Sequence, residues 1–167
     1  RMGGNVMRAC ALLPAVTGNL GKPGAGIYYL NGFAGPGLDD GYLTASHFSH
    51  DVPNISHMDL ADALADPARS RALVCWNMNV AASAPRQRQL LQALKRDDLF
   101  TVVIDLFQTD TADYADIVLP AASFLEFDDL VTPYFQMMLS AQVKAMAPLG
   151  ESLPTQEIFR RLARAMN

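Results

Sequence analysis

The chain is poor in cysteine and in basic residues, and each shortage excludes a class of protein. Its 167 residues include two cysteines, Cys10 and Cys75, which do not form a Cys-x-x-Cys motif. A zinc or iron–sulfur centre built from the cysteines of this chain alone is therefore excluded. Thirteen Lys and Arg residues against seventeen Asp and Glu residues give a net charge of −4, so the basic face of a nucleic-acid-binding protein is not expected.

Long hydrophobic runs are also missing, although half of the residues are hydrophobic. No apolar run has the length that a membrane-spanning helix needs, so we expect no membrane insertion by this chain. The apolar stretch 7–16 contains Pro14 and leads into a glycine-rich loop, which argues against a signal peptide. A charged fraction of 18% with this hydrophobic content is typical of a globular domain that has its own core.

Short apolar runs alternate with helical patterns in the second part of the chain. We expect buried strands at the three apolar runs and helices at the amphipathic or capped stretches, namely strands at 72–76, 100–104 and 117–119 and helices at 86–96, 110–115 and 155–166. Residues 77–85 are expected to form a loop, and 133–147 fit a strand or a helix equally well. Continuous apolar strands that alternate with helices indicate a parallel sheet covered on both faces. We therefore predict an α/β fold, a Rossmann-like parallel sheet flanked by helices, within residues 59–167.

Residues 1–58 have a different character. We expect a helix at 6–16, a glycine-rich loop at 18–26 and then an irregular segment punctuated by turns. The loop is not a phosphate-binding P-loop, because Pro23 stands where Ser or Thr must follow Gly-Lys, and it follows a helix rather than a strand. The chain starts at Arg1 without an initiator Met and ends inside a helical pattern, so we expect it to be one central domain of a larger enzyme.

Polar side chains follow the first two predicted strands, at the points where those strands end. Asn77 and Asn79 follow the first strand, Asp105 ends the second, and Thr109 and Thr111 precede the next helix. Ligands of parallel α/β sheets bind beyond the carboxyl ends of the strands, where an amide can read a base and a carboxylate can accept from ribose hydroxyls. The alternative is that the asparagines shape a turn and the threonines cap a helix.

Histidines and acids are further candidates for a metal or catalytic site. The His-x-x-His pair of His47 and His50, with His57, has no supporting cysteine, so a metal site is not favoured, and no Ser-His-Asp or Cys-His motif is present. The acids of the second part could bind Mg²⁺ but stand mostly at caps and loop edges, where a solvated or capping role is expected. They are Asp105, Asp110, Asp113, Asp116, Glu126, Asp128 and Asp129.

Three blocks of the sequence, in order, resemble the molybdopterin oxidoreductases. They are Gly3-Gly4-Asn5 through the loop TGNLGKPGAG at 17–26, the stretch DLFQTDTADYADIVLP at 105–120, and the ending from Gly150-Glu151 to Arg160. This family includes formate dehydrogenases, nitrate reductases and dimethyl sulfoxide reductase. The resemblance implies a Rossmann-like central domain that binds the guanosine end of a bis-molybdopterin guanine dinucleotide cofactor.

The resemblance also assigns residues and partners. Matched by position, Asn79 and Asp105 would contact guanosine, with Asn77 and Thr109 as further cofactor-binding candidates from the same loops. No catalytic residue and no metal ligand is assigned to this chain, which would not catalyse redox chemistry alone. The parent enzyme would carry molybdenum or tungsten and, in a region before Arg1, an iron–sulfur cluster. Its partners would be the remaining domains and an electron-transfer subunit, with no nucleic acid.

Two functions are alternatives to binding of the molybdopterin cofactor. One is a cofactor-free structural module, as in the large iron–sulfur subunit of respiratory NADH dehydrogenase, which resembles the same family. The feature that discriminates this alternative from cofactor binding is intact guanosine-loop chemistry, and Asn79 with Asp105 favours binding. Residues 76–80 depart from the family pattern, since they read Trp-Asn-Met-Asn-Val where many members have Gly-Asn-Pro. The other is an ordinary NAD-binding domain, which the missing glycine fingerprint after residues 72–76 disfavours.

Overall fold

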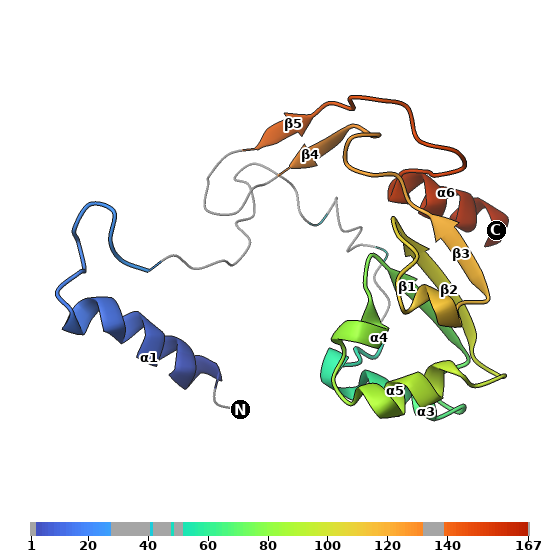
Figure 1. Ribbon diagram of the computed structural model, residues 1–167, viewed down its shortest axis with the longest axis horizontal. Coiled ribbons are helices and arrows are strands. Elements are labelled where there is room, and N and C mark those ends of the chain that lie inside the picture. Colours follow the sequence, from blue (N-terminus) through green and yellow to red (C-terminus); the bar gives the residue numbers. More distant parts are fainter. Residues whose placement is uncertain (1–2, 28–40, 42–47, 49–51, 132–138, 167) are drawn as a thin grey trace. The chain divides into compact units, whose positions relative to one another are not determined.

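The computed structural model of the protein describes residues 3–27, 41, 48, 52–131 and 139–166 (Figure 1). The chain divides into two compact units, Arg1–Ser46 with Leu130–Ser140 and His47–Asp129 with Ala141–Asn167. The expected division at residues 58 and 59 stays a prediction. Among the described residues, none of the helices is both long enough and apolar enough to cross a membrane.

The first unit contributes helix α1 (Gly3–Val16), which starts three residues before the expected helix at 6–16. The helix ends where the Thr17 N–H and hydroxyl both donate to the Leu13 carbonyl oxygen, at 3.1 and 2.7 Å. Gly18 follows with a φ of 67°, a left-handed conformation that glycine adopts without steric cost. The glycine-rich loop therefore begins as a helix stop, as expected for residues 18–26.

The second unit is built on a three-stranded parallel sheet in the order β1-β2-β3, with β1 at Ala72–Trp76, β2 at Phe100–Asp105 and β3 at Ile117–Pro120. Ala72 pairs with Phe100 and Val102 pairs with Ile117, so β2 lies between the two other strands. The predicted strand ranges, their parallel direction and the α/β fold class are confirmed. Because all three strands run the same way, their carboxyl ends lie at one edge of the sheet.

Short helices connect and cover the strands. They are η2 (His57–Asp59), α3 (Leu60–Ala65), α4 (Val80–Ser83), α5 (Gln87–Leu94), η3 (Ala112–Tyr114) and α6 (Thr155–Met166). A two-stranded sheet of β4 (Asp129–Val131) and β5 (Ser140–Gln142) takes part of the range left open at 133–147, of which 133–138 lie outside the described residues. Helix α6 has the predicted bounds. The predicted loop at 77–85 was wrong, since it contains α4, and the predicted helix at 110–115 is a single 3-10 turn.

One face of the sheet packs against α3, α4 and α5, which lie together on that side (Figure 1). Leu90 of α5 and Val103 of β2 are fully buried at the centre of this cluster. Helix α5 begins at Gln87 rather than at Arg86, because Arg86 has a φ of 54° and cannot continue the chain as a right-handed helix. This cluster is the main hydrophobic core of the second unit.

The other face of the sheet is covered by α6. Ile158 and Phe159 of α6 pack in a cluster that contains Ile104 of β2. The cover does not reach all of β1, where Trp76 stays 54% exposed although one ring edge contacts Phe159. The two sides of the sheet thus differ, since one is a closed core and the other leaves an aromatic ring open beside a strand end.

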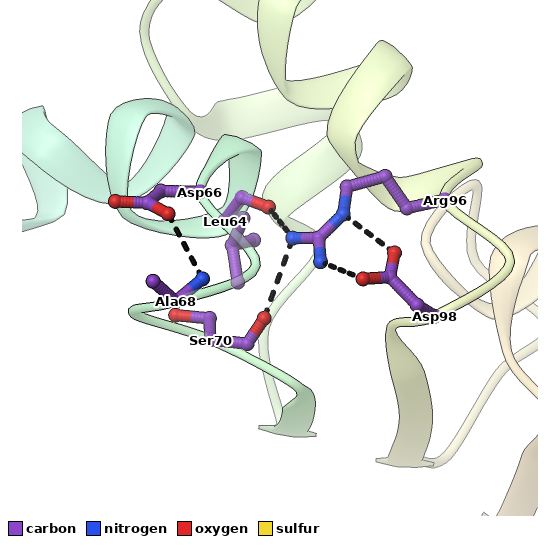
Figure 2. A network of polar contacts seen from close by, with 6 residues as sticks. All are labelled: Leu64, Asp66, Ala68, Ser70, Arg96 and Asp98. Carbon is purple, nitrogen blue, oxygen red and sulfur yellow. Dashed lines mark hydrogen bonds and ion pairs between the residues drawn. The ribbon is translucent and has the colours of Figure 1, made fainter.

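Arg96 links three chain segments at the end of α5 (Figure 2). Its guanidinium donates to the carbonyl oxygens of Leu64, in the last turn of α3, and Ser70, before β1, and forms a two-bond ion pair with Asp98. The ion pair raises the pKa of Arg96 and lowers that of Asp98. A planar guanidinium with five N–H donors can bridge these acceptors, which a lysine ammonium cannot do with the same geometry. Arg96 therefore fixes the approach to the amino ends of β1 and β2.

Replacing Leu90 by alanine should destabilise the second unit by about 2–5 kcal/mol, because the substitution leaves a cavity at a fully buried site. Urea denaturation followed by circular dichroism measures the change in the free energy of unfolding. The matched control is Leu20→Ala at a residue that is 57% exposed, where a change below about 0.5 kcal/mol is expected. Equal effects of the two substitutions would contradict the assignment of the core.

Replacing Arg96 by alanine should lower the midpoint temperature of thermal unfolding. Arg96→Lys should recover less than half of this decrease, because a lysine ammonium cannot form the two parallel hydrogen bonds that the guanidinium makes to Asp98. The loss should be measured by differential scanning calorimetry. Arg88→Ala is the control, since Arg88 is an exposed arginine of α5, the helix that precedes Arg96. Full recovery with lysine would show that only the charge of Arg96 matters.

Candidate functional site

The carboxyl edge of the parallel sheet carries the candidate site. Trp76, Asp105 and Pro120 are the last residues of β1, β2 and β3, and the loops that follow them gather at this edge. Of the four predicted cofactor-binding residues, Asp105 ends β2 and the other three stand in the loops after β1 and β2. Their side chains are engaged in different ways, which decides what each can still bind.

Asn79 is bonded to the loop that follows β2. Its amide oxygen accepts from the Thr111 hydroxyl at 2.8 Å, and its amide nitrogen donates to Asp110 Oδ2 at 3.0 Å. Thr111 is fully buried, and its hydroxyl oxygen also accepts from the Ala81 N–H at 3.0 Å. Both ends of the Asn79 amide are therefore used in joining two loops that are about thirty residues apart.

Asp105 is placed on the side of the sheet that faces the main core. One carboxylate oxygen accepts from the backbone N–H groups of Leu106 at 2.7 Å and Phe107 at 3.3 Å. In the described part of the chain no residue is seen to donate to its other oxygen. Asp105 stands two residues after Val103, which pairs with Cys75, so the alternation of side chains along a strand places it on the Cys75 face of the sheet. Burial raises the pKa of the Cys75 thiol, and the charge of Asp105 raises it further. No hydrogen bond recorded among the described residues joins Asp105 to Asn79, and their joint contact with guanosine stays a prediction.

Asn77 turns the chain immediately after β1. Its φ of 51° is left-handed, a conformation that asparagine tolerates better than most residues, and its N–H donates to the Ile104 carbonyl oxygen at 2.9 Å. Its side-chain amide has no hydrogen-bond partner among the described residues. Unlike the Asn79 amide, the Asn77 amide is thus free to bind a ligand.

Thr109 lies in the loop between β2 and η3. Its hydroxyl oxygen is buried and lacks a hydrogen-bond partner within the described residues, as is also true of Thr101 inside β2. A buried hydroxyl without a partner costs free energy, so such groups call for an explanation. A ligand oxygen would satisfy Thr109 only after a small opening of this loop.

Two adjoining cavities open beside the strand ends. The first, of about 250 Å³, is lined by Trp76, Asn77, Leu106, Ala121, Ala122, Phe124, Phe127 and Thr155, and is called the aromatic cavity below. The second, of about 420 Å³, is lined by Leu106, Phe107, Pro120, Ala121, Ser123, Glu126, Met146, Leu149 and Ser152. Both share Leu106 and Ala121, so they are neighbours on the α6 side of the sheet.

Glu126 holds the wall of the second cavity in place. Its carboxylate accepts from the backbone N–H groups of Ser123 and Leu149, each at 2.6 Å, which fastens two loops to each other. These hydrogen bonds, that from Ser123 first, lower the pKa of Glu126 from its ordinary value of 4.5. Sequence reasoning placed Glu126 only in a set of loop-edge acids, and nothing local in the sequence shows the contact with Leu149.

Two other acids of the predicted set, Asp116 and Asp128, accept hydrogen bonds from backbone N–H groups. Asp116 accepts from the Thr101 N–H at 2.7 Å and Asp128 from the Lys144 N–H at 2.8 Å, so these acids fasten loops. Within the described residues no group of three or more His, Cys, Asp or Glu side chains could hold a metal ion. His47 and His50 lie outside the described residues.

Comparison with known proteins identifies the family. The family model described as molybdopterin oxidoreductase matches residues 1–165 of this chain. The chain belongs to this family. A relative named "Probable oxidoreductase YoaE", from Bacillus subtilis (strain 168), is 38% identical over 173 residues, which cover 98% of this chain and 24% of the relative. The F420-dependent formate dehydrogenase 1 subunit alpha of Methanococcus maripaludis is 30% identical, over 98% of this chain and 27% of its own length.

A third relative is the assimilatory nitrate reductase catalytic subunit of Bacillus subtilis, 36% identical over 88 residues, which cover 53% of this chain and 12% of that protein. The chain thus spans about a quarter of the length of the first two relatives. The predicted family is confirmed, and with it a relation to proteins named formate dehydrogenase and nitrate reductase.

Acid should weaken the Glu126 contact. Because the folded-state pKa of Glu126 is lowered, its stabilising contribution is complete above the ordinary value of 4.5 and is lost as the pH falls through the folded-state pKa. The free energy of unfolding of the wild type should therefore be larger than that of Glu126→Gln at pH 7. The difference between the two should become smaller below about pH 4.5. Urea denaturation between pH 7 and pH 3 measures it. Glu151→Gln, at an exposed glutamate, is the control, and a difference that grows on acidification would contradict the assignment.

Proposed function

We propose that this chain is the part of a longer molybdopterin oxidoreductase that holds the guanosine end of a molybdopterin guanine dinucleotide, and that it has no redox activity alone. The observation that carries the proposal is the arrangement at the carboxyl edge of the sheet. There a cavity lined by Trp76 and a free Asn77 amide adjoins the loop that begins at Asp105. Ligand sites of parallel α/β sheets are found at this edge.

The residues present suit a nucleoside. The aromatic cavity offers ring surface for a base, and the Asn77 amide can both donate to and accept from the edge of that base. The unpaired carboxylate oxygen of Asp105 could accept from ribose hydroxyls, and the buried Thr109 hydroxyl lacks the partner that a ligand oxygen would provide. Asn79 would act by holding the two loops together, since both ends of its amide are occupied.

The chemistry of the whole enzyme belongs to parts beyond these loops. When bound, the cofactor supplies electron or oxygen-atom transfer at molybdenum or tungsten, and this chain supplies position and a hydrogen-bonding environment. The proposed partners are the remaining domains of the enzyme and an electron-transfer subunit, with an iron–sulfur cluster held elsewhere. Support comes from the relatives, which are about four times as long as this chain, and one of which is named as an alpha subunit.

A second candidate is a structural module that binds no cofactor. The observation in its favour is that the Asn79 amide and one oxygen of Asp105 are already used within the fold. On this alternative the strand-end loops would be stabilised by their own hydrogen bonds and would need no ligand. Binding of a guanine nucleotide distinguishes the two candidates.

Guanosine diphosphate should bind to the full chain, and Asp105→Ala should weaken binding at least about tenfold, since a hydrogen bond to a charged group contributes about 1.5–3 kcal/mol. Isothermal titration calorimetry measures the affinity. Asp105→Asn keeps an oxygen that can accept from the Leu106 N–H but removes the negative charge. Comparing it with Asp105→Ala therefore shows whether the affinity depends on the charge or on the hydrogen bond that fixes the turn.

The matched control is Asp97→Ala, an exposed aspartate in the turn before β2, at the opposite end of the sheet. It removes the same charge and should leave the affinity unchanged. If wild type fails to bind guanosine diphosphate, the structural module is the better account. If the two alanine variants weaken binding equally, the effect is a general one of charge and the role proposed for Asp105 is wrong.

A further inference from the structure

The aromatic cavity has an unusual lining for a site that must recognise guanine, because it contains no ionisable side chain. Its eight lining residues are three aromatic, three aliphatic and two neutral polar residues, the last being Asn77 and Thr155. Guanine presents two adjacent N–H donors on its pairing edge, and a carboxylate that accepts from both forms the charge-assisted hydrogen bonds that select it. The cavity offers no such group.

The nearest acids are directed elsewhere. Asp105 is adjacent in sequence to Leu106, which lines the cavity, but side chains of a strand alternate between faces. Asp105 is two residues after Val103, the partner of Cys75, so its side chain lies on the Cys75 face of the sheet. Glu126 lines only the neighbouring cavity, where its two oxygens accept from the backbone N–H groups of Ser123 and Leu149. Neither carboxylate is placed to accept from a base that rests against Trp76.

The aromatic rings of the cavity provide the attraction instead. Trp76 is held by an edge-to-face contact with Phe159, with ring centroids 5.3 Å apart and planes at 77°, and it keeps 54% of its surface exposed. A ring fixed in this way is a ready platform for stacking, and every base has a π-face, so stacking does not depend on the identity of the base. A purine covers more of the platform than a pyrimidine does.

Asn77 is the single side-chain amide that lines the cavity. Its backbone is fixed by the hydrogen bond to the Ile104 carbonyl oxygen, while its amide has no partner among the described residues. An amide carries a donor and an acceptor side by side, which match N6 and N7 of adenine and can equally donate to O6 of guanine or accept from its N–H groups. Asn77 therefore contributes little to a difference in affinity between guanine and adenine.

We propose that the aromatic cavity accepts the base of a purine nucleotide and discriminates only weakly between guanine and adenine. The inference rests on the proposed function and adds to it the base selectivity of the site. In this protein the choice of a guanine nucleotide is not made by the cavity that receives the base. Purine is preferred to pyrimidine through the area of stacking on Trp76.

The test uses the full chain, in which Trp76 is the single tryptophan. Guanosine, adenosine and cytidine diphosphates are titrated by calorimetry for affinity and by tryptophan fluorescence for location. The dissociation constants for the two purine nucleotides should agree within about threefold, and that for cytidine diphosphate should be about tenfold weaker because less ring area is stacked. The purine nucleotides should quench the fluorescence of Trp76.

A variant that gains selectivity sharpens the test. Asn77→Asp introduces the missing carboxylate at a left-handed position that aspartate also tolerates, so it should raise the preference for guanosine over adenosine diphosphate at least about tenfold. Asn77→Gly is the matched control, since glycine keeps the backbone conformation and removes the amide. This variant should reduce the affinity for both purine nucleotides by the same factor.

The outcomes separate the two proposals. If guanosine diphosphate binds wild type more than about thirtyfold tighter than adenosine diphosphate, the weak selectivity is overturned while the proposed function stands. Binding without any change in Trp76 fluorescence would likewise place the base outside the aromatic cavity. If none of the three nucleotides binds, the proposed function fails and the inference fails with it.

Discussion

The parallel pairing of β2 with both of its neighbours is the constraint on which the second unit depends. Val103, at the middle of β2, is fully buried and pairs with Cys75 on one side and Val118 on the other. Because all three strands run in one direction, each must leave the sheet at the same edge, and each loop brings backbone and side-chain polar groups there. The hydrogen bonds of Asn79 join the loops after β1 and β2, and those of Asp105 fix the start of the loop that follows β2. Those of Glu126 fasten the segment after β3 to the segment before α6.

The strands could be predicted because a strand buried in a parallel sheet is a short continuous apolar run. The bounds Ala72–Trp76 follow from such a run and from the turn-forming asparagine that comes next. The helix Val80–Ser83 could not be predicted, since four residues are too few to show a period, and Asn79 before it looks like part of a loop. The left-handed conformation of Arg86 could not be predicted either, since arginine has no local preference for a positive φ.

The candidate site shows a sharper division between local and distant information. Position in the sequence was enough to place Asn77, Asn79, Asp105 and Thr109 after strands or before a turn. It could not show that Thr111 and Asp110 occupy the Asn79 amide, because those contacts join residues about thirty positions apart. The sequence predicts Trp76 as the last residue of a strand but not as part of a cavity. The orientation of its ring depends on the contact with Phe159, more than eighty residues later.

The Glu126 contact has a consequence for how freely this region can change in evolution. Both partners donate through main-chain N–H groups. The Ser123 side chain also forms a hydrogen bond with the carboxylate, whereas the Leu149 side chain takes no part. Any residue other than proline can supply the same donor. The shape of the neighbouring cavity can therefore be altered by substitution at position 149 while the hydrogen bond that fastens this loop stays in place.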